Sequence, residues 1–509
     1  MISCHILHLP KPDLSDNRSD ELRLREAFLK ASGLRNVIIP LAICRILPLL
    51  LKKSGYHVRV MAIDVNHGWE IVDVCDAIEA GSCYGVAIDL GTTTIVLSLV
   101  DLERKNILDT ISITNPQIQY GEDILIRSQA ASEKGGLEKL HAAVVDGLNR
   151  VISEMAARCN AKINNFYALT VAGNTVMGHI LMKLDISGIT KEPYIPVTNT
   201  PDMILASELE ISIHPRGRVY ILPNRGSYVG GDTMAGILIS GMYKKQGISL
   251  LVDVGTNAEV VLGNSEWMVA CAGSAGPALE GGVLLCGTRG VDGAIEDVTI
   301  DKETLALSYQ TIGGKKPSGI CGSGAVHLLS ELFTSGIIDQ SGRFSENFGH
   351  DRIVEKDGEK RYTLASPWES AHGKEIFLAE SDIKNLVLSK GAMFTILSVL
   401  VQEVGIKFED IESFFVAGVF GNYLNPEKAI AIGMLPDIPM ERYQLIGNSS
   451  IKGAAEALVS RDARKELAKI RDKLTYIEMN VNENFMSQFR GSLFLPHTDL
   501  TFFPSAYPS

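Results

Sequence analysis

The chain has no closely spaced cysteines. Its eight cysteines stand at positions 4, 44, 75, 83, 159, 271, 286 and 321. Zinc and ferredoxin-type sites usually draw ligand pairs separated by roughly two to four residues, and that spacing is absent here. Scattered cysteines in a chain of this size favour small buried hydrophobic groups over a disulfide framework.

Positive charge and uninterrupted apolar runs are also scarce. The chain carries 48 Lys and Arg against 60 Asp and Glu, a net charge of −12, which argues against a broad electrostatic hold on nucleic acid or anionic lipid. The most apolar run, residues 36–53, is interrupted by Pro40, Arg45 and Pro48 and falls short of the roughly 20 residues that cross a bilayer. The first 20 residues do not have the pattern of a signal peptide. We therefore expect a cytoplasmic protein with no nucleic-acid or membrane partner.

The 509 residues exceed the roughly 100–200 residues of one domain, so several compact parts are expected. Strand, glycine turn, strand and then helix recur in both halves of the chain, which predicts an α/β fold. We expect a small α/β linker domain over residues 1–82, followed by two similar domains over residues 83–247 and 248–509.

Two acidic glycine turns carry the strongest chemical signal. "DLGTTT" (89–94) and "DVGTNAE" (253–259) each place an aspartate at the end of an apolar strand, followed by glycine and short polar residues. Glycine lets backbone N–H groups approach phosphate oxygens closely, and a carboxylate suits a hydrated Mg²⁺. A single copy is more typical of a simple hairpin turn, but two copies favour a polyphosphate clamp. Neither copy is a Walker A or a dinucleotide-binding loop.

Local signals predict where several helices begin. Asp232 or Thr233 is expected to cap a helix beside Gly230 and Gly231, and Ser323 to cap one that ends at Gly336. Ser381 and Asp382 are expected to begin a long apolar helix that runs through Val404. Asn425 followed by Pro426 indicates another helix start.

The motifs resemble those of a known superfamily. "DLGTTT", "DVGTNAEV" and "FVAGVFGNY" are similar to the phosphate-1, phosphate-2 and adenosine motifs of the actin-like ATPases, which include acetate and sugar kinases, heat-shock chaperones and actin. From about Tyr84 to Pro504 the chain more narrowly resembles the ATP-dependent reductive activators of corrinoid proteins. Segments that carry this likeness include "NPQIQYGEDILIR", "VAGNTVM", "YVGGD", "SAGPALEGG", "ICGSGAVHLL" and "LPHTDLTFFPS". The residues before them resemble the linker segment of that family.

The resemblance implies two ribonuclease-H-like subdomains with an ATP cleft between them, preceded by the linker domain. It also implies ATP hydrolysis that drives an electron onto a Co(II) corrinoid, on a corrinoid protein or a corrinoid-dependent methyltransferase, to give Co(I). A homodimer is expected from the same likeness.

Carried over by motif, the resemblance assigns roles to individual residues. Asp89 and Asp253 would be catalytic and would organise Mg²⁺, through water. The residues expected to bind the nucleotide are Gly91, Thr92, Thr93, Thr94, Gly230, Gly231, Asp232, Gly255, Thr256, Asn257, Gly418, Gly421 and Asn422.

One family feature is absent from the sequence. Such activators carry an iron–sulfur domain, in many members an N-terminal [2Fe–2S] module with closely spaced cysteines, and these 509 residues contain none. Three explanations stay open: the sequence starts downstream of the true N-terminus, a separate ferredoxin-like protein donates electrons, or the redox role has been lost.

Three other functions are compatible with parts of the sequence. Cys321, in "ICGSGAVHLL", resembles the helix start that holds a [4Fe–4S] cluster between subunits in 2-hydroxyacyl-CoA dehydratase activators. The second cysteine of those proteins is missing here, where Lys374 and Glu375 precede "IFLAES", so a buried or capping Cys321 is favoured.

The nucleotide motifs alone also permit a small-molecule kinase, or an ATP-driven clamp or chaperone without redox chemistry. The histidines, including His179, His214 and His327, are interpreted as structural or surface groups.

Overall fold

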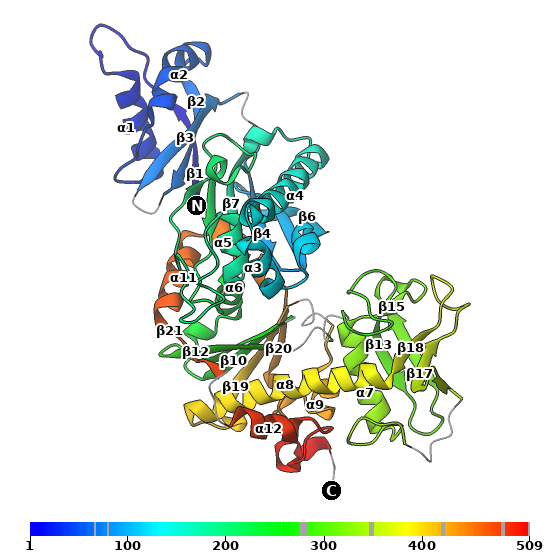
Figure 1. Ribbon diagram of the computed structural model, residues 1–509. Helices are drawn as coiled ribbons and strands as arrows, with labels where there is room; N and C mark the ends of the chain where they lie inside the picture. Colours follow the sequence, from blue (N-terminus) through cyan, green and yellow to red (C-terminus); the bar gives the residue numbers. More distant parts are fainter. Residues whose placement is uncertain are drawn as a thin grey trace. The chain divides into compact units, whose positions relative to one another are not determined.

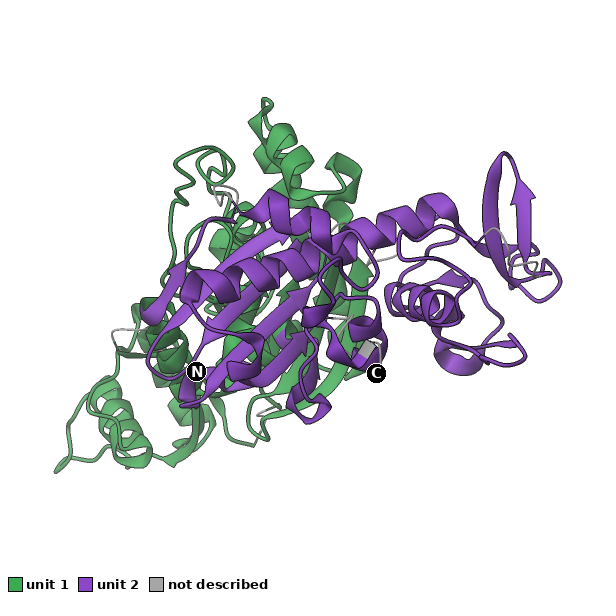
Figure 2. Cartoon of the chain, turned by 90° about the horizontal axis from the view of Figure 1, so that it is seen from below, with its two compact units in different colours: residues 1–238, 450–472 green, residues 239–449, 473–509 purple. Residues whose placement is uncertain are grey.

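The chain forms two compact units. The computed structural model describes residues 1–65, 68–78, 81–255, 257–274, 278, 282–345, 351–418, 423–479 and 484–506 (Figure 1). Unit 1 consists of residues 1–238 and 450–472, and unit 2 of residues 239–449 and 473–509 (Figure 2). Each unit has its own hydrophobic core around its own sheets.

Unit 1 begins with a small α/β module. Its antiparallel sheet has the order β1-β2-β3, with β1 (Ile2–His8), β2 (His57–Asp64) and β3 (Trp69–Asp76). Two helices, α1 (Asp20–Ser32) and α2 (Leu41–Lys53), contribute to its core. The hairpin predicted between β2 and β3 is confirmed by their antiparallel pairing; Asn66 and His67 lie outside the described residues.

A six-stranded sheet forms the centre of unit 1. Its order is β6-β5-β4-β7-β9-β8. The strands are β4 (Tyr84–Leu90), β5 (Thr94–Asp101), β6 (Asn106–Thr114), β7 (Phe166–Gly173), β8 (Ile204–Leu205) and β9 (Arg218–Ile221). The first three are antiparallel neighbours, whereas β7 runs parallel to β4 and β9 runs parallel to β7. Strand β4 is apolar almost throughout because it lies at the centre of this sheet.

Helices from distant parts of the chain belong to unit 1. They are α3 (Ile124–Ser132), α4 (Gly136–Arg158), α5 (Thr175–Leu181), α6 (Gly231–Ser240), α10 (Ser449–Val459) and α11 (Arg461–Lys473). The apolar spacing that predicts α4 matches its buried residues. Helix α10 is bonded to β7 of this sheet, since Thr170 Oγ1 donates a hydrogen bond of 2.7 Å to the carbonyl of Ala454.

Unit 2 repeats the strand plan of unit 1. Its six-stranded sheet has the order β20-β19-β10-β11-β12-β21. The strands are β10 (Ile248–Val254), β11 (Asn257–Gly263), β12 (Met268–Ser274), β19 (Ile411–Ala417), β20 (Tyr443–Gly447) and β21 (Leu474–Tyr476). Again three consecutive strands are antiparallel, and two later strands, β19 and β20, run parallel on the other side of the first. The mixed α/β fold and its internal repeat are therefore as predicted.

A long segment separates β12 from β19. It forms two small sheets, β14-β13-β15 and β16-β17-β18. Its strands are β13 (Ala294–Ile300), β14 (Leu307–Thr311), β15 (Gly319–Ile320), β16 (Ile353–Lys356), β17 (Glu359–Ala365) and β18 (Ile376–Ala379), and its helices are α7 (Gly322–Thr334) and α8 (Glu380–Val404). Helix α9 (Pro426–Ala431) follows β19, and α12 (Phe485–Ser492) packs on α8. Helix α8 is long and apolar enough to span a membrane by length and composition alone. However, 72% of its most apolar stretch is buried in the protein, as in a core helix.

Helix starts agree with the sequence in one case and differ in others. Asn425 caps α9 as predicted, because its side chain accepts from the N–H groups of Glu427 and Lys428. The prediction for Ser323 is wrong, since α7 begins at Gly322 with Cys321 as its N-cap. The chain is held extended up to that point because Cys321 N donates to the carbonyl of Ile295 in β13. Helix α8 begins at Glu380, one residue before the predicted start.

Candidate functional site

The first acidic turn lies between the two central strands of unit 1. Asp89 is the penultimate residue of β4, and Gly91, Thr92 and Thr93 form the turn into β5, which Thr94 begins. Asp89 lies opposite Ala172 of the parallel strand β7, so the residues that follow both strands meet at one edge of the sheet (Figure 1). Asp89 and residues 91–94 are partly exposed.

Three polar side chains hold this turn from behind. Asn115 Nδ2 donates to the carbonyl of Gly91 at 2.9 Å, and Asn174 Nδ2 donates to the Thr92 hydroxyl at 3.0 Å. Arg127 Nη2 donates to the carbonyl of Thr92 at 2.6 Å. The turn is thus held by three later residues, which fall in two of the motifs that carry the family resemblance; the sequence assigned none of them a role. Asn115 and Asn174 each directly follow a strand and precede a helix, which is a signal that points to them, whereas Arg127 lies within α3 and no local signal identifies it.

Arg127 is the most unusual of these partners. Its side chain is fully buried, and burial lowers its pKa to about 10, so it stays charged at neutral pH. Its guanidinium also donates to the carbonyl of Gly121 at 2.9 Å and to Gln117 Oε1 at 3.2 Å. A buried cation directly behind the turn raises the local positive potential, which favours an anion in front of it.

The residues at the start of α6 pack closely against the end of β7, next to the first acidic turn. A side chain at Gly230 would place its Cβ 2.5 Å from Asn174 Cα and 2.7 Å from the carbonyl of Gly173. Only glycine allows this approach. Gly231 begins α6 and is buried, and the next residue, Asp232, accepts from the N–H of Thr233 at 2.8 Å. Desolvation raises the pKa of the Asp232 carboxyl. The structure therefore brings the predicted residues 91–94 and 230–232 to one edge of unit 1.

The second acidic turn occupies the equivalent position in unit 2. Asp253 precedes the last residue of β10, and Gly255 N donates to the carbonyl of Asn257 at 2.9 Å across the tight turn. Gly418 follows the parallel strand β19, and its φ of +87° lies in the left-handed region. A Cβ at Gly418 would sit 2.8 Å from Asp253 Oδ1. This glycine therefore leaves open a space beside the carboxylate that any side chain would fill.

A second carboxylate accompanies Asp253. Glu259 lies directly opposite Asp253 in the antiparallel pairing of β10 with β11, so both side chains point to the same face of the sheet. Two neighbouring carboxylates provide the oxygen ligands that a hydrated divalent cation prefers. Glu259 is the last residue of the motif "DVGTNAE", but it was not among the site residues predicted from the sequence. The predicted residues Thr256, Gly421 and Asn422 lie outside the described residues.

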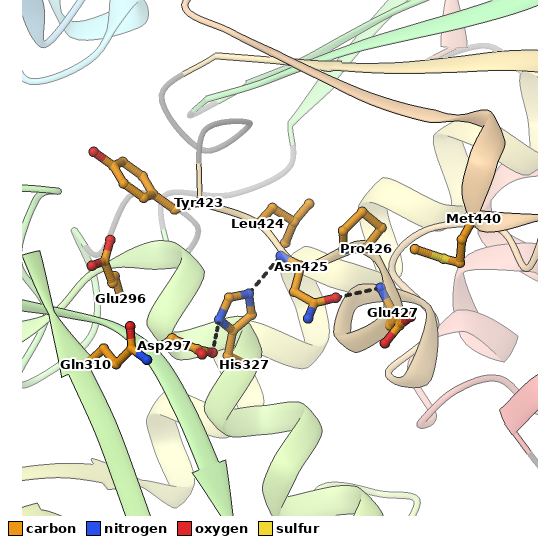
Figure 3. A pocket seen from close by; sticks show the side chains of 10 residues that line it. All are labelled: Glu296, Asp297, Gln310, His327, Tyr423, Leu424, Asn425, Pro426, Glu427 and Met440. Carbon is orange, nitrogen blue, oxygen red and sulfur yellow. Dashed lines mark hydrogen bonds and ion pairs between the residues drawn. The ribbon is translucent and has the colours of Figure 1, made fainter.

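A cavity of about 490 Å³ in unit 2 is lined in part by Tyr423, the last residue of the predicted adenosine motif, and by the residues that follow it. Figure 3 shows the side chains that line it: Glu296, Asp297, Gln310, His327, Tyr423, Leu424, Asn425, Pro426, Glu427 and Met440. Three of them are carboxylates, so the cavity favours hydroxyl and amino groups over phosphates. The single exposed aromatic ring in this set, Tyr423, offers a flat apolar surface.

His327 connects the walls of this cavity. Its Nε2 accepts from the N–H of Asn425 at 2.9 Å, and its Nδ1 lies 2.9 Å from Asp297 Oδ1 (Figure 3). Burial, assisted by the charge of Lys428, lowers the pKa of His327 to about 4. The neutral ring therefore positions the segment after β19 and is not a free acid or base.

The cysteines do not assemble an iron–sulfur site. All eight are described and free, and the Cys321 thiol donates to the carbonyl of Ile295 at 3.2 Å beneath the start of α7. Within the described residues, the one group of at least three potential metal ligands contains Cys4 and Cys83 together with Glu103. Because a [2Fe–2S] cluster needs four thiolates, or two with two imidazoles, these residues do not fit it.

Comparison with protein families gives three matches in chain order. Residues 2–78 match the RACo linker region, residues 84–245 the RACo middle region, and residues 247–507 the C-terminal domain of RACo, described as the ASKHA domain. Together these matches span nearly the whole chain. The boundaries predicted from the sequence stay predictions.

Individual proteins resemble the chain over most of its length. A protein named corrinoid activation enzyme RamQ, from Eubacterium limosum, is 30% identical over 80% of this chain and 69% of its own length. A protein named [Co(II) methylated amine-specific corrinoid protein] reductase, from Methanosarcina barkeri, is 24% identical over 79% of this chain and 75% of its own. A solved structure described as a reductive activator for corrinoid, iron–sulfur protein superposes with a TM-score of 0.94, at 39% identity, over 99% of this chain and 80% of that one.

Proposed function

The chain belongs to the RACo family, whose linker, middle and ASKHA regions it carries in that order, and from this premise we propose that it reductively activates a corrinoid protein with the free energy of ATP. The observation that carries the proposal is the paired acidic turn, one at the same position in each of two sheets in which five strands follow the same order. The relatives named for corrinoid activation and Co(II) corrinoid reduction supply the substrate class.

The described residues fit a magnesium nucleotide. In unit 1 the turn 91–94 offers N–H and hydroxyl groups in front of the buried Arg127 charge, and Gly230 leaves room beside them. In unit 2, Asp253 and Glu259 offer carboxylate oxygens next to the space left by Gly418. When bound, Mg-ATP supplies the free energy of phosphoanhydride hydrolysis. Asp89 and Asp253 are proposed to hold the cation through water and to orient the attacking water.

We propose that the cavity after β19 receives the nucleoside end. Glu296, Asp297 and Glu427 accept hydrogen bonds from hydroxyl or amino groups, and Tyr423 provides a ring surface. His327 keeps this wall in place through Asn425. The adenosine motif residues 418, 421 and 422 directly precede it in the chain, which supports the same assignment.

The redox step is a one-electron reduction of Co(II) to Co(I). Since the described cysteines do not form an iron–sulfur site, the electron is proposed to come from a ferredoxin-like protein or an iron–sulfur module outside these residues. ATP binding and hydrolysis are proposed to switch the protein between two states that bias the partner's corrinoid environment. A cytoplasmic homodimer is part of the same proposal.

A coupled assay tests this function. The chain, Mg-ATP, a chemical or ferredoxin electron donor and a Co(II) corrinoid protein are mixed, and Co(I) is followed by its visible absorption. We expect Co(I) to form only with ATP, and phosphate release to increase when the corrinoid protein is added. Formation of Co(I) without ATP would contradict the proposal. So would a rate of phosphate release that does not change when the corrinoid protein is added.

Variants of the second turn test the assignment of the cation. Asp253→Asn should abolish ATP turnover without loss of fold, and Glu259→Gln should raise the Mg²⁺ concentration needed for half-maximal turnover about tenfold, because one of two neighbouring carboxylates loses its charge. Glu266→Gln, a change at an exposed position in the turn between β11 and β12, is the matched control and should behave as the parent protein.

A further inference from the structure

A cluster of metal-ligating side chains lies in unit 1, among residues that have no part in the nucleotide proposal. Cys4 is on β1, Cys83 directly precedes β4, and Glu103 follows β5. The Sγ atoms of Cys4 and Cys83 each lie 3.5 Å from the same oxygen, Glu103 Oε1. All three donor atoms lie within 4.8 Å of one another. The three residues come from both sheets of unit 1, so their convergence is a property of the fold and not of local sequence.

The spacing of the donors matches the edges of a tetrahedron around zinc. With Zn–S bonds of about 2.3 Å and a Zn–O bond of about 2.0 Å, a tetrahedral site has S···O edges of about 3.5 Å. Both S···O distances in the cluster have this value. The expected S···S edge is about 3.8 Å, and the two sulfur atoms lie no more than 4.8 Å apart. Little movement is therefore needed to bring three ligands onto one ion.

The cluster opens into a cavity that leaves room for a fourth ligand. The cavity has a volume of about 630 Å³ and is lined by Cys4, Cys83 and Glu103 together with Arg59. Glu103 is 45% exposed, whereas the Cys83 side chain is buried. A metal ion can thus enter from the carboxylate side, and a water molecule can complete its coordination.

The charges around the cluster balance when a divalent cation is present. Two thiolates and one carboxylate carry three negative charges. Zn²⁺ adds two positive charges, and Arg59, which is 5% exposed with Nη1 at 3.5 Å from Glu103 Oε1, adds the third. A buried group of charges is stable only when it is compensated in this way.

We propose that Cys4, Cys83 and Glu103 bind one Zn²⁺ ion, with water as the fourth ligand. On binding, each thiol loses its proton to solvent as its sulfur–zinc bond forms, so two protons are released per ion. The ion joins β1 of the linker sheet to the two residues that flank the β4–β5 hairpin of the six-stranded sheet, Cys83 before β4 and Glu103 after β5. Its role is to fix the linker sheet on the first subdomain, independently of whether the chain activates a corrinoid.

Zinc binding to the full chain tests the site directly. The protein is stripped with a chelator, and zinc chloride is added in competition with a chromogenic chelator. We expect one Zn²⁺ per chain and release of two protons. Co²⁺ in place of Zn²⁺ should give the visible bands of tetrahedral cobalt and a thiolate-to-cobalt charge-transfer band. If the parent protein takes up no zinc under these conditions, the proposal is wrong.

Three variants separate a built site from surface binding. Cys4→Ser and Glu103→Gln should each weaken zinc binding at least tenfold; Glu103 is half exposed, so its variant keeps the fold even if a cysteine change does not. Cys75→Ser is the matched control, because Cys75 lies opposite Arg59 on β3 but outside the cluster. Equal affinity in all three variants, or equal loss in all three, would overturn the assignment.

Discussion

A single buried cation, the side chain of Arg127, organises the first acidic turn. The Arg127 guanidinium contacts Thr92, Gly121 and Gln117, which come from two segments on either side of β5 and β6. A lysine keeps the charge but has one compact ammonium, so it cannot reach three acceptors in fixed directions. Under the proposed function, Arg127 therefore acts on the nucleotide indirectly, through the shape of the turn.

Arg127→Lys should weaken nucleotide binding more than it weakens the fold. Lysine retains the buried charge but cannot keep the fixed bond to the Thr92 carbonyl, which lets the turn change shape, so we expect the KM for ATP to rise about tenfold while kcat changes little. Arg158→Lys, a change at a surface arginine that is 51% exposed, is the control. An unchanged KM in Arg127→Lys, measured by phosphate release, would show that the turn does not depend on this side chain.

Because His327 is buried in its neutral form, we predict that the free energy of unfolding depends on pH. Its folded pKa of about 4 lies below the ordinary value of 6.5, so between these pH values the unfolded chain binds more protons than the folded protein. The free energy of unfolding is therefore fully retained above pH 6.5 and falls as the pH drops toward 4, by about 3 kcal/mol for this group. Urea unfolding at several pH values in this window measures the slope.

Two variants assign that slope. His327→Gln removes the titrating group and should flatten the pH dependence between 6.5 and 4, whereas His372→Gln, at an exposed histidine, should leave it as in the parent protein. A slope that survives in His327→Gln would place the titration elsewhere.

At the scale of elements, hydrophobic pattern and turn chemistry predicted most of the structure. The hairpins around Gly91 and Gly255 and the buried faces of α4 and α8 follow from apolar spacing that the sequence displays openly. The start of α7 could not be predicted in this way. It depends on the bond from Cys321 N to Ile295, which joins residues 26 positions apart, and local capping preference carries no information about such a contact.

Helix α8 depends on a buried lysine for its contact with the C-terminal segment. Lys390 is 1% exposed and donates to the carbonyls of Phe494 and Pro496, and burial lowers its pKa to about 7. The apolar pattern of α8 gives no reason to expect a lysine here. Its role is visible only once the C-terminal segment is in place.

Lys390→Met should destabilise unit 2 by about 2 kcal/mol, because two buried carbonyls lose their donor. Lys384→Met, at an exposed position on the same helix, is the control for the change in helix composition. Chemical denaturation measures both. If Lys390→Met is as stable as the parent protein, removing the desolvation of the ammonium fully offsets the lost hydrogen bonds.

At the scale of the whole molecule, the two compact units are not continuous in sequence. Helices α10 and α11, from residues 449–473, return to unit 1. A Cβ on Gly453 would lie 2.4 Å from the Cβ of Ala235 in α6, and Arg461 Nε lies 2.8 Å from Asp64 Oδ2. The sequence showed the repeated plan of the two halves but not the return of α10 and α11 to unit 1. Helical periodicity does not identify the surface on which a helix packs.

Residues 1–247 alone should therefore fold poorly, although they contain every strand of the unit 1 sheets. Without α10 the carbonyl partner of the buried Thr170 hydroxyl is absent and apolar surface on α6 is exposed, so we expect dye binding and non-cooperative unfolding. Joining residues 449–473 to this fragment through a flexible linker should restore cooperative unfolding.

A point variant tests the same contact in the full chain. Gly453→Val forces α10 away from Ala235 and should destabilise unit 1 by about 1–3 kcal/mol, as overpacking does. Glu456→Val, on an exposed position of α10, is the matched control. Equal stability of the two variants, together with cooperative unfolding of residues 1–247 alone, would show that unit 1 completes its core without the returning helices.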